Sequence, residues 1–140
     1  MVSLPGGIEG YLNFCTAKTT NLATGARLTN SPEYLLGAGI TVPLWAEKLY
    51  VSPAIRFVDQ RSAYNGVDTD SYFLVNLSIT TAKLFDSLDL SLHVFNLFDE
   101  EYLVPGGDTE FNYRPGTSDY IYFNIPQEGR SLHLQIAYRF

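Results

Sequence analysis

The sequence predicts an all-β fold: an antiparallel transmembrane β-barrel segment of about six strands, with short periplasmic turns and long external loops. Apolar and polar residues alternate with period two along six segments, which is the pattern of strands with one apolar face. These segments approach the ~9–11 residues that a tilted strand needs to cross a bilayer. The connections between them are alternately short and long, as in barrels of the bacterial outer membrane.

The six expected strands share the same alternation. In chain order they span residues 9–15, 36–42, 49–57, 73–80, 88–95 and 130–140. The pattern is clearest in the last strand, where one face carries Leu132, Leu134, Ile136, Tyr138 and Phe140. Pro53 falls inside the third strand, where its missing N–H predicts a bulge or an irregular stretch.

The lengths of the connections support the same fold. Two connections are short, at 44–48 and 83–87, and three are long, at 20–33, 60–71 and 99–127. Because an antiparallel chain reverses direction at every connection, the short ones gather at one end of the sheet and the long ones at the other. The C-terminus then lies at the short-turn end. Tight turns on one side and long loops on the other are typical of outer-membrane barrels.

The composition limits the number of domains and the class of partner. A length of 140 residues fits one domain, which we expect to span residues 1–140. The net charge of −6 argues against a nucleic-acid binder, because such proteins need a basic surface. With 1 cysteine, Cys15, the chain has no internal disulfide framework. We see neither an apolar run of the ~18 residues expected of a membrane-spanning helix nor a signal peptide.

A soluble antiparallel sandwich also produces alternating strands and is the main alternative fold. Its polar face would carry Lys and Glu, whereas this face carries mainly Ser, Thr, Asn, Gly, His and Gln. Aromatic residues also gather near both ends of the strands, as in the girdles of membrane barrels. The short-turn end has Trp45, Phe85, Tyr138 and Phe140, and the long-loop end has Phe57, Tyr72, Phe73, Phe95, Phe98 and Tyr102. The sequence therefore favours the membrane barrel.

Two motifs near the C-terminus carry a resemblance to a known family. The fifth expected strand ends in Asn96, Leu97, Phe98 and Asp99, and Tyr102 follows closely. Gly129 and Arg130 then open the last strand, which ends in an aromatic residue. Together these motifs resemble the end of the barrel in TonB-dependent outer-membrane receptors, and the resemblance covers about residues 7–140.

The resemblance implies a location in the cell outer membrane and a role in ligand import. Receptors of this family are 22-stranded barrels with a plug domain in the lumen, and they take up ferric siderophores, haem, cobalamin or oligosaccharides by means of TonB. The present sequence has room for about six strands and for neither a plug nor a TonB-contact segment. We therefore expect the C-terminal portion of such a barrel, incomplete and not transport-competent alone. The identity of the small-molecule ligand is left open.

Other functions are alternatives at this point. A small autonomous outer-membrane protein would close its barrel by oligomerisation and act as a pore or adhesin, and a soluble all-β binding module is a further alternative. An enzyme is the weakest alternative. His93 and His133 have Ser91, Ser131 and Asp89 nearby, but a catalytic triad is defined by geometry, and such polar residues line any barrel. We predict no catalytic residue, no cofactor and no metal ligand.

The resemblance also implies a recognition signal for the barrel-assembly machinery in the last strand, carried by Ile136, Tyr138 and Phe140. An exposed terminal strand offers backbone groups for strand addition, and its alternate side chains give specificity. The simpler interpretation, compatible with the first, is that these residues are ordinary lipid-facing side chains.

The loop after the fifth strand is the expected contact with ligand. Residues 99–119 hold six acidic side chains and one basic side chain, which suits either a cation site or a solvated loop near lipopolysaccharide headgroups. Aromatic residues in this loop offer faces for stacking on a sugar or a siderophore ring. The residues expected to face ligand are Glu110, Tyr113, Arg114 and Tyr120. On the polar face of the strands, Arg56 and Arg139 would pair with carboxylates or line the ligand path in a complete receptor.

Overall fold

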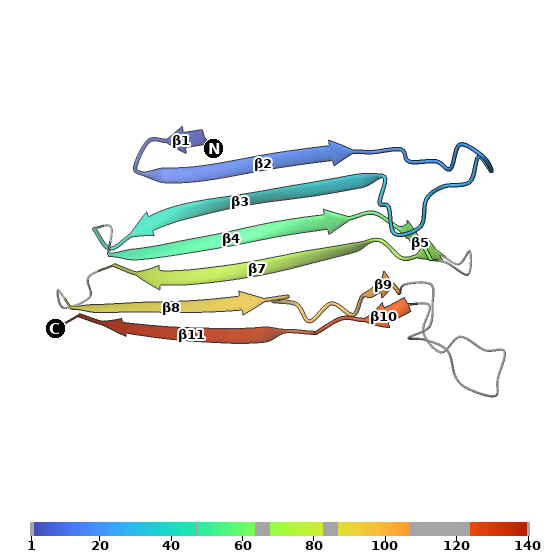
Figure 1. Ribbon diagram of the computed structural model, residues 1–140. Helices are drawn as coiled ribbons and strands as arrows, with labels where there is room; N and C mark the ends of the chain where they lie inside the picture. The colour runs from blue at the N-terminus through green and yellow to red at the C-terminus, as the bar shows by residue number, and fades with distance from the viewer. Residues whose placement is uncertain (1, 47, 64–67, 83–86, 107–123, 140) are drawn as a thin grey trace, which may run out of the picture.

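The protein forms one broad antiparallel sheet with two small two-stranded sheets at one end (Figure 1). The structure, a computed structural model, describes residues 2–46, 48–63, 68–82, 87–106 and 124–139. The main sheet has the strand order β1-β2-β3-β4-β7-β8-β11 and is open, with β1 and β11 at its edges. The bounds of its strands are β1 Val2–Leu4, β2 Ile8–Thr16, β3 Tyr34–Leu44, β4 Leu49–Val58, β7 Tyr72–Thr81, β8 Leu88–Phe95 and β11 Ser131–Tyr138. Within the described residues, no helix has the length and hydropathy needed to cross a membrane.

The six expected strands are confirmed as β2, β3, β4, β7, β8 and β11. The described residues contain five shorter strands that the sequence pattern does not predict. The first, β1, pairs with β2 through a turn in which Gly6 and Gly7 have positive φ angles of 82° and 73°. The others form the small sheets in the long connections, where β5 (Arg61–Ser62) pairs with β6 (Asp68–Thr69) and β9 (Leu103–Pro105) pairs with β10 (Asn124–Pro126). Elements of two or three residues are too short to produce a period-two pattern.

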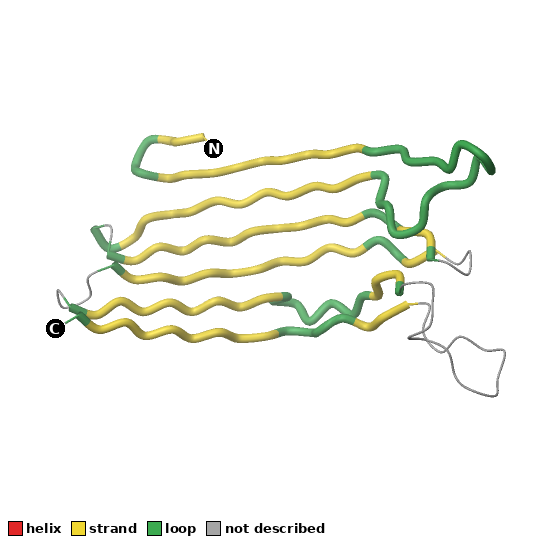
Figure 2. The backbone as a smooth tube through the Cα atoms, in the orientation of Figure 1, coloured by secondary structure: helices red, strands yellow, loops and turns green. Residues whose placement is uncertain are grey.

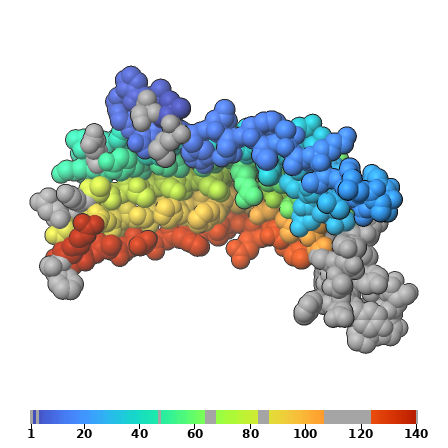
Figure 3. All heavy atoms as spheres, turned by 45° about the horizontal axis from the view of Figure 1, so that its top comes forward, coloured from blue at the N-terminus to red at the C-terminus, as the bar shows by residue number. Residues whose placement is uncertain are grey.

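The connections divide between the two ends of the sheet as the sequence predicts (Figure 2). At the short-turn end, Trp45 and Ala46 turn the chain from β3 to β4 with φ angles of 50° and 53°. The C-terminal side lies at this end too, where the Arg139 N–H donates to the Ser87 carbonyl at 2.9 Å. At the opposite end the chain between β2 and β3 forms a long ordered loop, which gives that end its thickness in Figure 3.

The register places the apolar and polar side chains on separate faces. Leu134 of β11 lies opposite Leu92 of β8, which in turn lies opposite Ile79 of β7. In the adjacent row, His133 lies opposite His93, which lies opposite Ser78. Because side chains alternate along a strand, these two rows project from opposite faces. The sheet therefore has one apolar face and one polar face across strands β7, β8 and β11.

The buried residues lie at the long-loop end rather than under the strands. The side chains with the lowest exposed fractions include Val58, Ala63, Thr69, Tyr72 and Asn96, at 2%, 1%, 3%, 8% and 5%. By contrast, the apolar face of β11 is open, with exposed fractions of 66% at Leu132, 67% at Leu134 and 64% at Ile136. The described strands of the main sheet form a single layer, not the two packed layers of a sandwich. This continuous exposed apolar surface needs another apolar environment to cover it.

The loop between β2 and β3 is fixed to the β5–β6 pair by arginine side chains. Arg27 donates through Nη2 to the carbonyls of Ser31 and Gln60, both at 3.4 Å. Arg61 donates through Nη1 to Asn30 Oδ1 at 3.1 Å. These contacts hold the long-loop end together and place Arg61 beside the region described below.

Two aromatic residues do not lie where the girdle interpretation placed them. Phe95 is two residues from His93 on β8 and shares its polar face, where its ring meets His133 edge-on at 5.2 Å between ring centroids. Tyr72 lies on the face of Ser78 on β7 and is buried. The prediction that both belong to a lipid-facing outer girdle is therefore wrong, because strand parity and not position along the strand decides the face.

Pro53 interrupts the hydrogen-bond ladder between β3 and β4 without adding a bulge. On one side β4 keeps continuous pairing with β7, and Pro53 lies opposite Leu77. On the other side the pairs Gly39–Ala54 and Val42–Val51 keep one register across the proline. A bulge would insert an extra residue and shift that register. The strands are linked at this point by side chains instead, with Thr41 Oγ1 and Ser52 Oγ 3.0 Å apart.

Candidate functional site

The Asn-Leu-Phe-Asp motif follows β8 and begins with Asn96, which makes three hydrogen bonds, two through its side chain and one through its backbone N–H. Asn96 has a left-handed backbone, with φ of 50°, which asparagine tolerates better than most residues. Its N–H donates to Asn76 Oδ1 at 2.9 Å. Its amide Nδ2 donates to the Glu100 carbonyl at 2.9 Å, and its Oδ1 accepts from the Glu100 N–H at 2.8 Å. Asn96 thus anchors the following turn to β7.

Asp99 then joins this turn to the start of the last strand. It also has a left-handed backbone, with φ of 60°, and its Oδ1 accepts from the Arg130 N–H at 2.6 Å. A Cβ at Gly129 would stand 2.5 Å from the same oxygen, so glycine is what permits this approach. The Arg130 side chain donates through Nη1 to the Leu97 carbonyl at 3.5 Å. We call Asn96, Asp99, Gly129 and Arg130 the clamp.

The clamp explains in physical terms why these residue types occur together. Two motifs that are 31 residues apart in sequence meet at one hydrogen bond. This hydrogen bond therefore holds the two ends of the intervening chain segment together. Leu97 takes part through its backbone, with its N–H donating to the Val75 carbonyl at 2.7 Å. Phe98 is 74% exposed.

We expect replacement of Gly129 by alanine to destabilise the folded protein by ~1–3 kcal/mol, the usual cost of overpacking. The new methyl group meets Asp99 Oδ1, which is not free to move because it holds the Arg130 N–H. Urea unfolding of the variant in detergent measures the loss. The double variant with Asp99→Gly removes the obstructing oxygen, so there the alanine at 129 should add little further cost. An equal cost in both backgrounds would contradict the contact.

Tyr102 follows the first half of the clamp in sequence and lines a cavity. Its ring packs on Tyr72 with centroids 4.3 Å apart, and its carbonyl accepts from the Gln127 N–H at 3.1 Å. Burial is the main cause that raises the pKa of the Tyr102 phenol above its ordinary value, with a smaller contribution from Tyr72. The phenol is therefore neutral at neutral pH and available as a hydrogen-bond donor. Arg61 lies over the other ring, with its guanidinium carbon 5.7 Å from the Tyr72 centroid.

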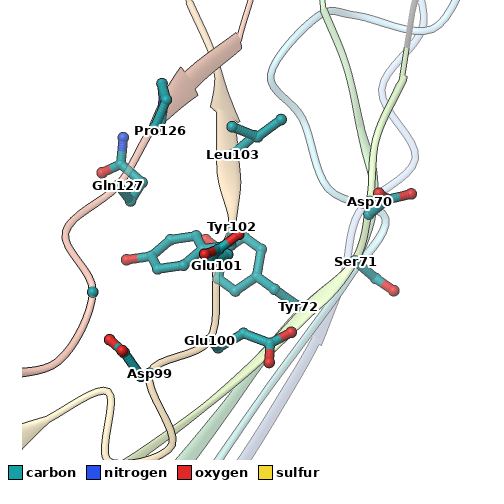
Figure 4. Close-up of a pocket in the computed structure, with 11 residues that line it drawn as sticks. Asp70, Ser71, Tyr72, Asp99, Glu100, Glu101, Tyr102, Leu103, Pro126 and Gln127 are labelled. Carbon is teal, nitrogen blue, oxygen red and sulfur yellow. The ribbon is translucent and has the colours of Figure 1, made fainter.

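The cavity lies between the start of β7, the turn after β8 and the chain that leaves β10 (Figure 4). Its volume is about 680 Å³, within the ~300–1,000 Å³ range of small-molecule sites. Its lining comprises Asp70, Ser71, Tyr72, Asp99, Glu100, Glu101, Tyr102, Leu103, Pro126, Gln127 and Gly129. Carboxylates, amide groups and two tyrosine rings together suit a ligand with hydrogen-bond donors and a flat surface.

Sequence reasoning found part of this cavity and missed part. The motif residues Asp99 and Tyr102 line it, but Asp70, Tyr72 and Gln127 were not proposed as site residues. Tyr72 shares its parity with the polar residues of β7, and this signal was present in the sequence. Asp70 and Gln127 reach the cavity through tertiary folding alone.

Several predicted residues lie elsewhere. Glu110, Tyr113, Arg114 and Tyr120, the residues expected to face ligand, lie outside the described residues, as does Phe140. Ile136 and Tyr138, of the expected assembly signal, project from the edge strand β11 with exposed fractions of 64% and 65%. Cys15 is exposed near the end of β2.

The histidines on the polar face do not form a triad with the residues considered for one. His93 Nδ1 lies 2.9 Å from Ser78 Oγ, not beside Ser91 or Ser131. Asp89 forms an ion pair with Arg139 at 2.7 Å, and four residues of strand separate it from His93 by about 13 Å. Within the part of the chain that the structure describes, no group of three metal-ligating side chains is found.

Comparison with solved structures identifies the fold. No family model matches the sequence, and no curated protein matches it. The chain is similar to the ferric-catecholate import receptor Fiu from E. coli K12, with TM-score 0.71 and 17% identity over 98% of this chain and 19% of Fiu. It is also similar to P. aeruginosa FpvA bound to pyoverdines, with TM-score 0.73 and 18% identity over 96% of this chain and 18% of FpvA. A structure of the FpvAI–pyocin S2 complex matches equally well, with TM-score 0.72 and 18% identity over 96% of this chain and 17% of that one.

The chain has the fold of part of a TonB-dependent receptor. It spans less than a fifth of the length of the receptors that it matches. The all-β antiparallel fold expected from the sequence is thereby confirmed, and the sheet of the present chain is open. Of these neighbours, Fiu is named as a ferric-catecholate import receptor and FpvA is bound to pyoverdines, and neither description is that of an enzyme.

Proposed function

We propose that residues 1–140 form the C-terminal portion of the barrel wall in a TonB-dependent receptor of the outer membrane. The observation that carries this proposal is the likeness to import receptors over 96–98% of the chain. The open sheet is consistent with it, since an unpaired edge is not tolerated in lipid, and in this proposal the remaining strands come from further polypeptide. Alone, the 140 residues would not transport.

The receptor would bind a scarce ligand at the outer face and import it. We propose a ferric siderophore as this ligand, because Fiu is named for ferric-catecholate import and the FpvA structure holds pyoverdine. The cavity at the long-loop end lies on the external side in this arrangement. Its tyrosine rings and carboxylates would contact part of the ligand. The plug and TonB would act only in the complete receptor, and the barrel-assembly machinery would insert it through β11.

Deleting the gene that encodes this chain should abolish uptake of its iron complex from iron-limited medium. The measurement is the uptake of radiolabelled iron supplied as a panel of ferric siderophores to wild-type, deleted and complemented cells. A strain that lacks TonB should lose the same uptake, because the energy for import comes through TonB in this family. Unchanged uptake of every complex in the deleted strain would contradict siderophore import.

A small outer-membrane protein that closes by oligomerisation is the second candidate. Both edges of the sheet, β1 and β11, lack a neighbouring strand among the described residues, so they are free to pair with another copy. An immunoblot of outer membranes from the same cells separates the two candidates. The receptor proposal requires a band several times heavier than 15.7 kDa, whereas an autonomous protein gives the 15.7 kDa monomer on boiling.

A further inference from the structure

The cavity at the long-loop end is lined by more negative than positive charge. Four of its lining residues are acidic, and none of the described lining residues is a lysine or an arginine. Residues 107–123, which lie outside the described ranges, hold three acidic side chains and one basic side chain. Even if that basic side chain paired with one lining carboxylate, the excess of negative charge would remain. The four acidic lining residues are Asp70, Asp99, Glu100 and Glu101.

Three of these four carboxylates are available to a ligand. Asp99 is engaged in the clamp, where its Oδ1 accepts a backbone N–H. Glu100 bonds to Asn96 through its backbone N–H and carbonyl, and its side chain is exposed. Glu101 and Asp70 are exposed as well, and Figure 4 shows the acidic side chains around the two tyrosine rings. Because an ionised carboxylate only accepts hydrogen bonds and bonds most strongly to a charged donor, these groups suit a cation.

The tyrosine rings offer a surface that attracts a positive charge. Tyr102 packs on Tyr72 with ring centroids 4.3 Å apart, and the Arg61 guanidinium carbon lies 5.7 Å from the Tyr72 centroid. The face of a tyrosine ring attracts cations, and this stack already holds one that belongs to the protein. Tyr102 is only partly buried, and it lines the cavity together with Glu101. A cationic group of a ligand in the cavity can therefore meet a ring face and a carboxylate together.

The buried hydroxyl of Tyr72 indicates a second feature of the ligand. Tyr72 is 8% exposed and lines the cavity. Its oxygen accepts from Arg61 Nη2 at 3.3 Å, and among the described residues no group accepts the proton of this hydroxyl. Buried donors are normally paired. We therefore expect the ligand to bring a neutral acceptor, such as a carbonyl oxygen, in addition to its cationic group.

We propose that this cavity selects positively charged ferric siderophores, in which a neutral ferric trihydroxamate carries a protonated amine. The inference rests on the proposed function and specifies its substrate class. The hydroxamate oxygens accept hydrogen bonds from the tyrosine hydroxyls, and the amine donates to Asp70, Glu100 and Glu101. Ferric tris-catecholates are strongly anionic, and like charges placed together oppose binding. The cavity therefore rejects the class of complex for which Fiu is named.

The test measures binding of three ferric complexes to the intact receptor purified in detergent, by quenching of tryptophan fluorescence. Ferrioxamine B carries a protonated amine, and its N-acetylated form has the same ferric core without the charge. Ferric enterobactin is the anionic comparison. At low salt we expect ferrioxamine B to bind about tenfold more tightly than the acetylated form and ferric enterobactin to bind most weakly. The preference should shrink at high salt, because salt screens exposed charges.

A double variant tests whether the lining carboxylates cause this preference. Glu100→Gln combined with Glu101→Gln should remove most of it and leave the affinity for the acetylated form nearly unchanged. Glutamine keeps the backbone bonds of residue 100 to Asn96. The control combines Glu33→Gln with Asp59→Asn, which removes the same charge from residues that do not line the cavity. The control should keep the preference of the wild type.

The proposal is overturned if the two ferrioxamines bind equally at low salt, if neither binds, or if ferric enterobactin binds more tightly than both. An unchanged preference in the double variant, or an equal loss of preference in the control, would also overturn it. Import of an anionic complex alone in the uptake experiment would contradict this inference and leave receptor function standing. Conversely, the binding measurement on the purified receptor does not require transport, so the two failures are distinguishable.

Discussion

Replacement of Asn96 by alanine should lower the free energy of unfolding of the intact receptor by ~2–6 kcal/mol. Alanine at a φ of 50° carries a backbone strain of ~1–3 kcal/mol. The variant also loses both side-chain hydrogen bonds to Glu100, and each such bond contributes ~0.5–1.5 kcal/mol to stability. Urea unfolding in detergent micelles, followed by tryptophan fluorescence, measures the change.

Two matched variants separate the causes of this loss. Asn96→Gly keeps the left-handed backbone without strain and removes only the side-chain bonds, so it should be less destabilised than Asn96→Ala. Asn96→Asp keeps an acceptor for the Glu100 N–H and loses the donor to the Glu100 carbonyl. We expect the wild type to be the most stable, the Asn96→Asp and Asn96→Gly variants to be less stable, and the Asn96→Ala variant to be the least stable. Equal stability of the alanine and glycine variants would show that the backbone conformation of residue 96 is not a factor.

The strands were predictable from sequence because their pattern is local. The alternation of Leu132, Leu134 and Ile136 with polar neighbours depends only on the two-residue repeat of a strand, and β11 follows it. The same rule, applied to Phe95 and Tyr72, would have placed both rings on the polar face. Their position near the strand ends is typical of a girdle, but parity decides which face a side chain occupies.

The cavity was less predictable because its geometry is tertiary. The bond from the Arg130 N–H to Asp99 joins positions 31 residues apart, and no sequence period reports such a contact. Resemblance marked the clamp residues, but it gave no account of what each one does. The structure supplies that account, with a left-handed backbone at Asn96 and Asp99 and a glycine where a Cβ would meet a carboxylate oxygen. The predicted roles of Glu110 and Tyr113 stay predictions.

Leu134→Arg should prevent or weaken insertion of the barrel, whereas Gln135→Arg on the same strand should not. Leu134 lies near the middle of β11 on the apolar face, opposite Leu92, and is 67% exposed in this sheet. An arginine on the lipid face near the bilayer midplane costs ~2–4 kcal/mol, while lumen positions tolerate charge. The two variants add the same side chain one residue apart, so differences in expression and net charge cancel.

The measurement is urea unfolding of the refolded receptor in lipid vesicles, together with the folded fraction in outer membranes from the mobility difference between boiled and unboiled samples. The soluble alternative makes the opposite prediction for Leu134→Arg. An exposed leucine on a water-facing sheet can be replaced by arginine with little loss, because surface substitutions usually change stability by no more than ~0.5 kcal/mol. Equal and small effects of the two variants would therefore exclude the membrane-facing role of the apolar face. A large loss confined to Leu134→Arg places that face in lipid and the face of Gln135 in the lumen.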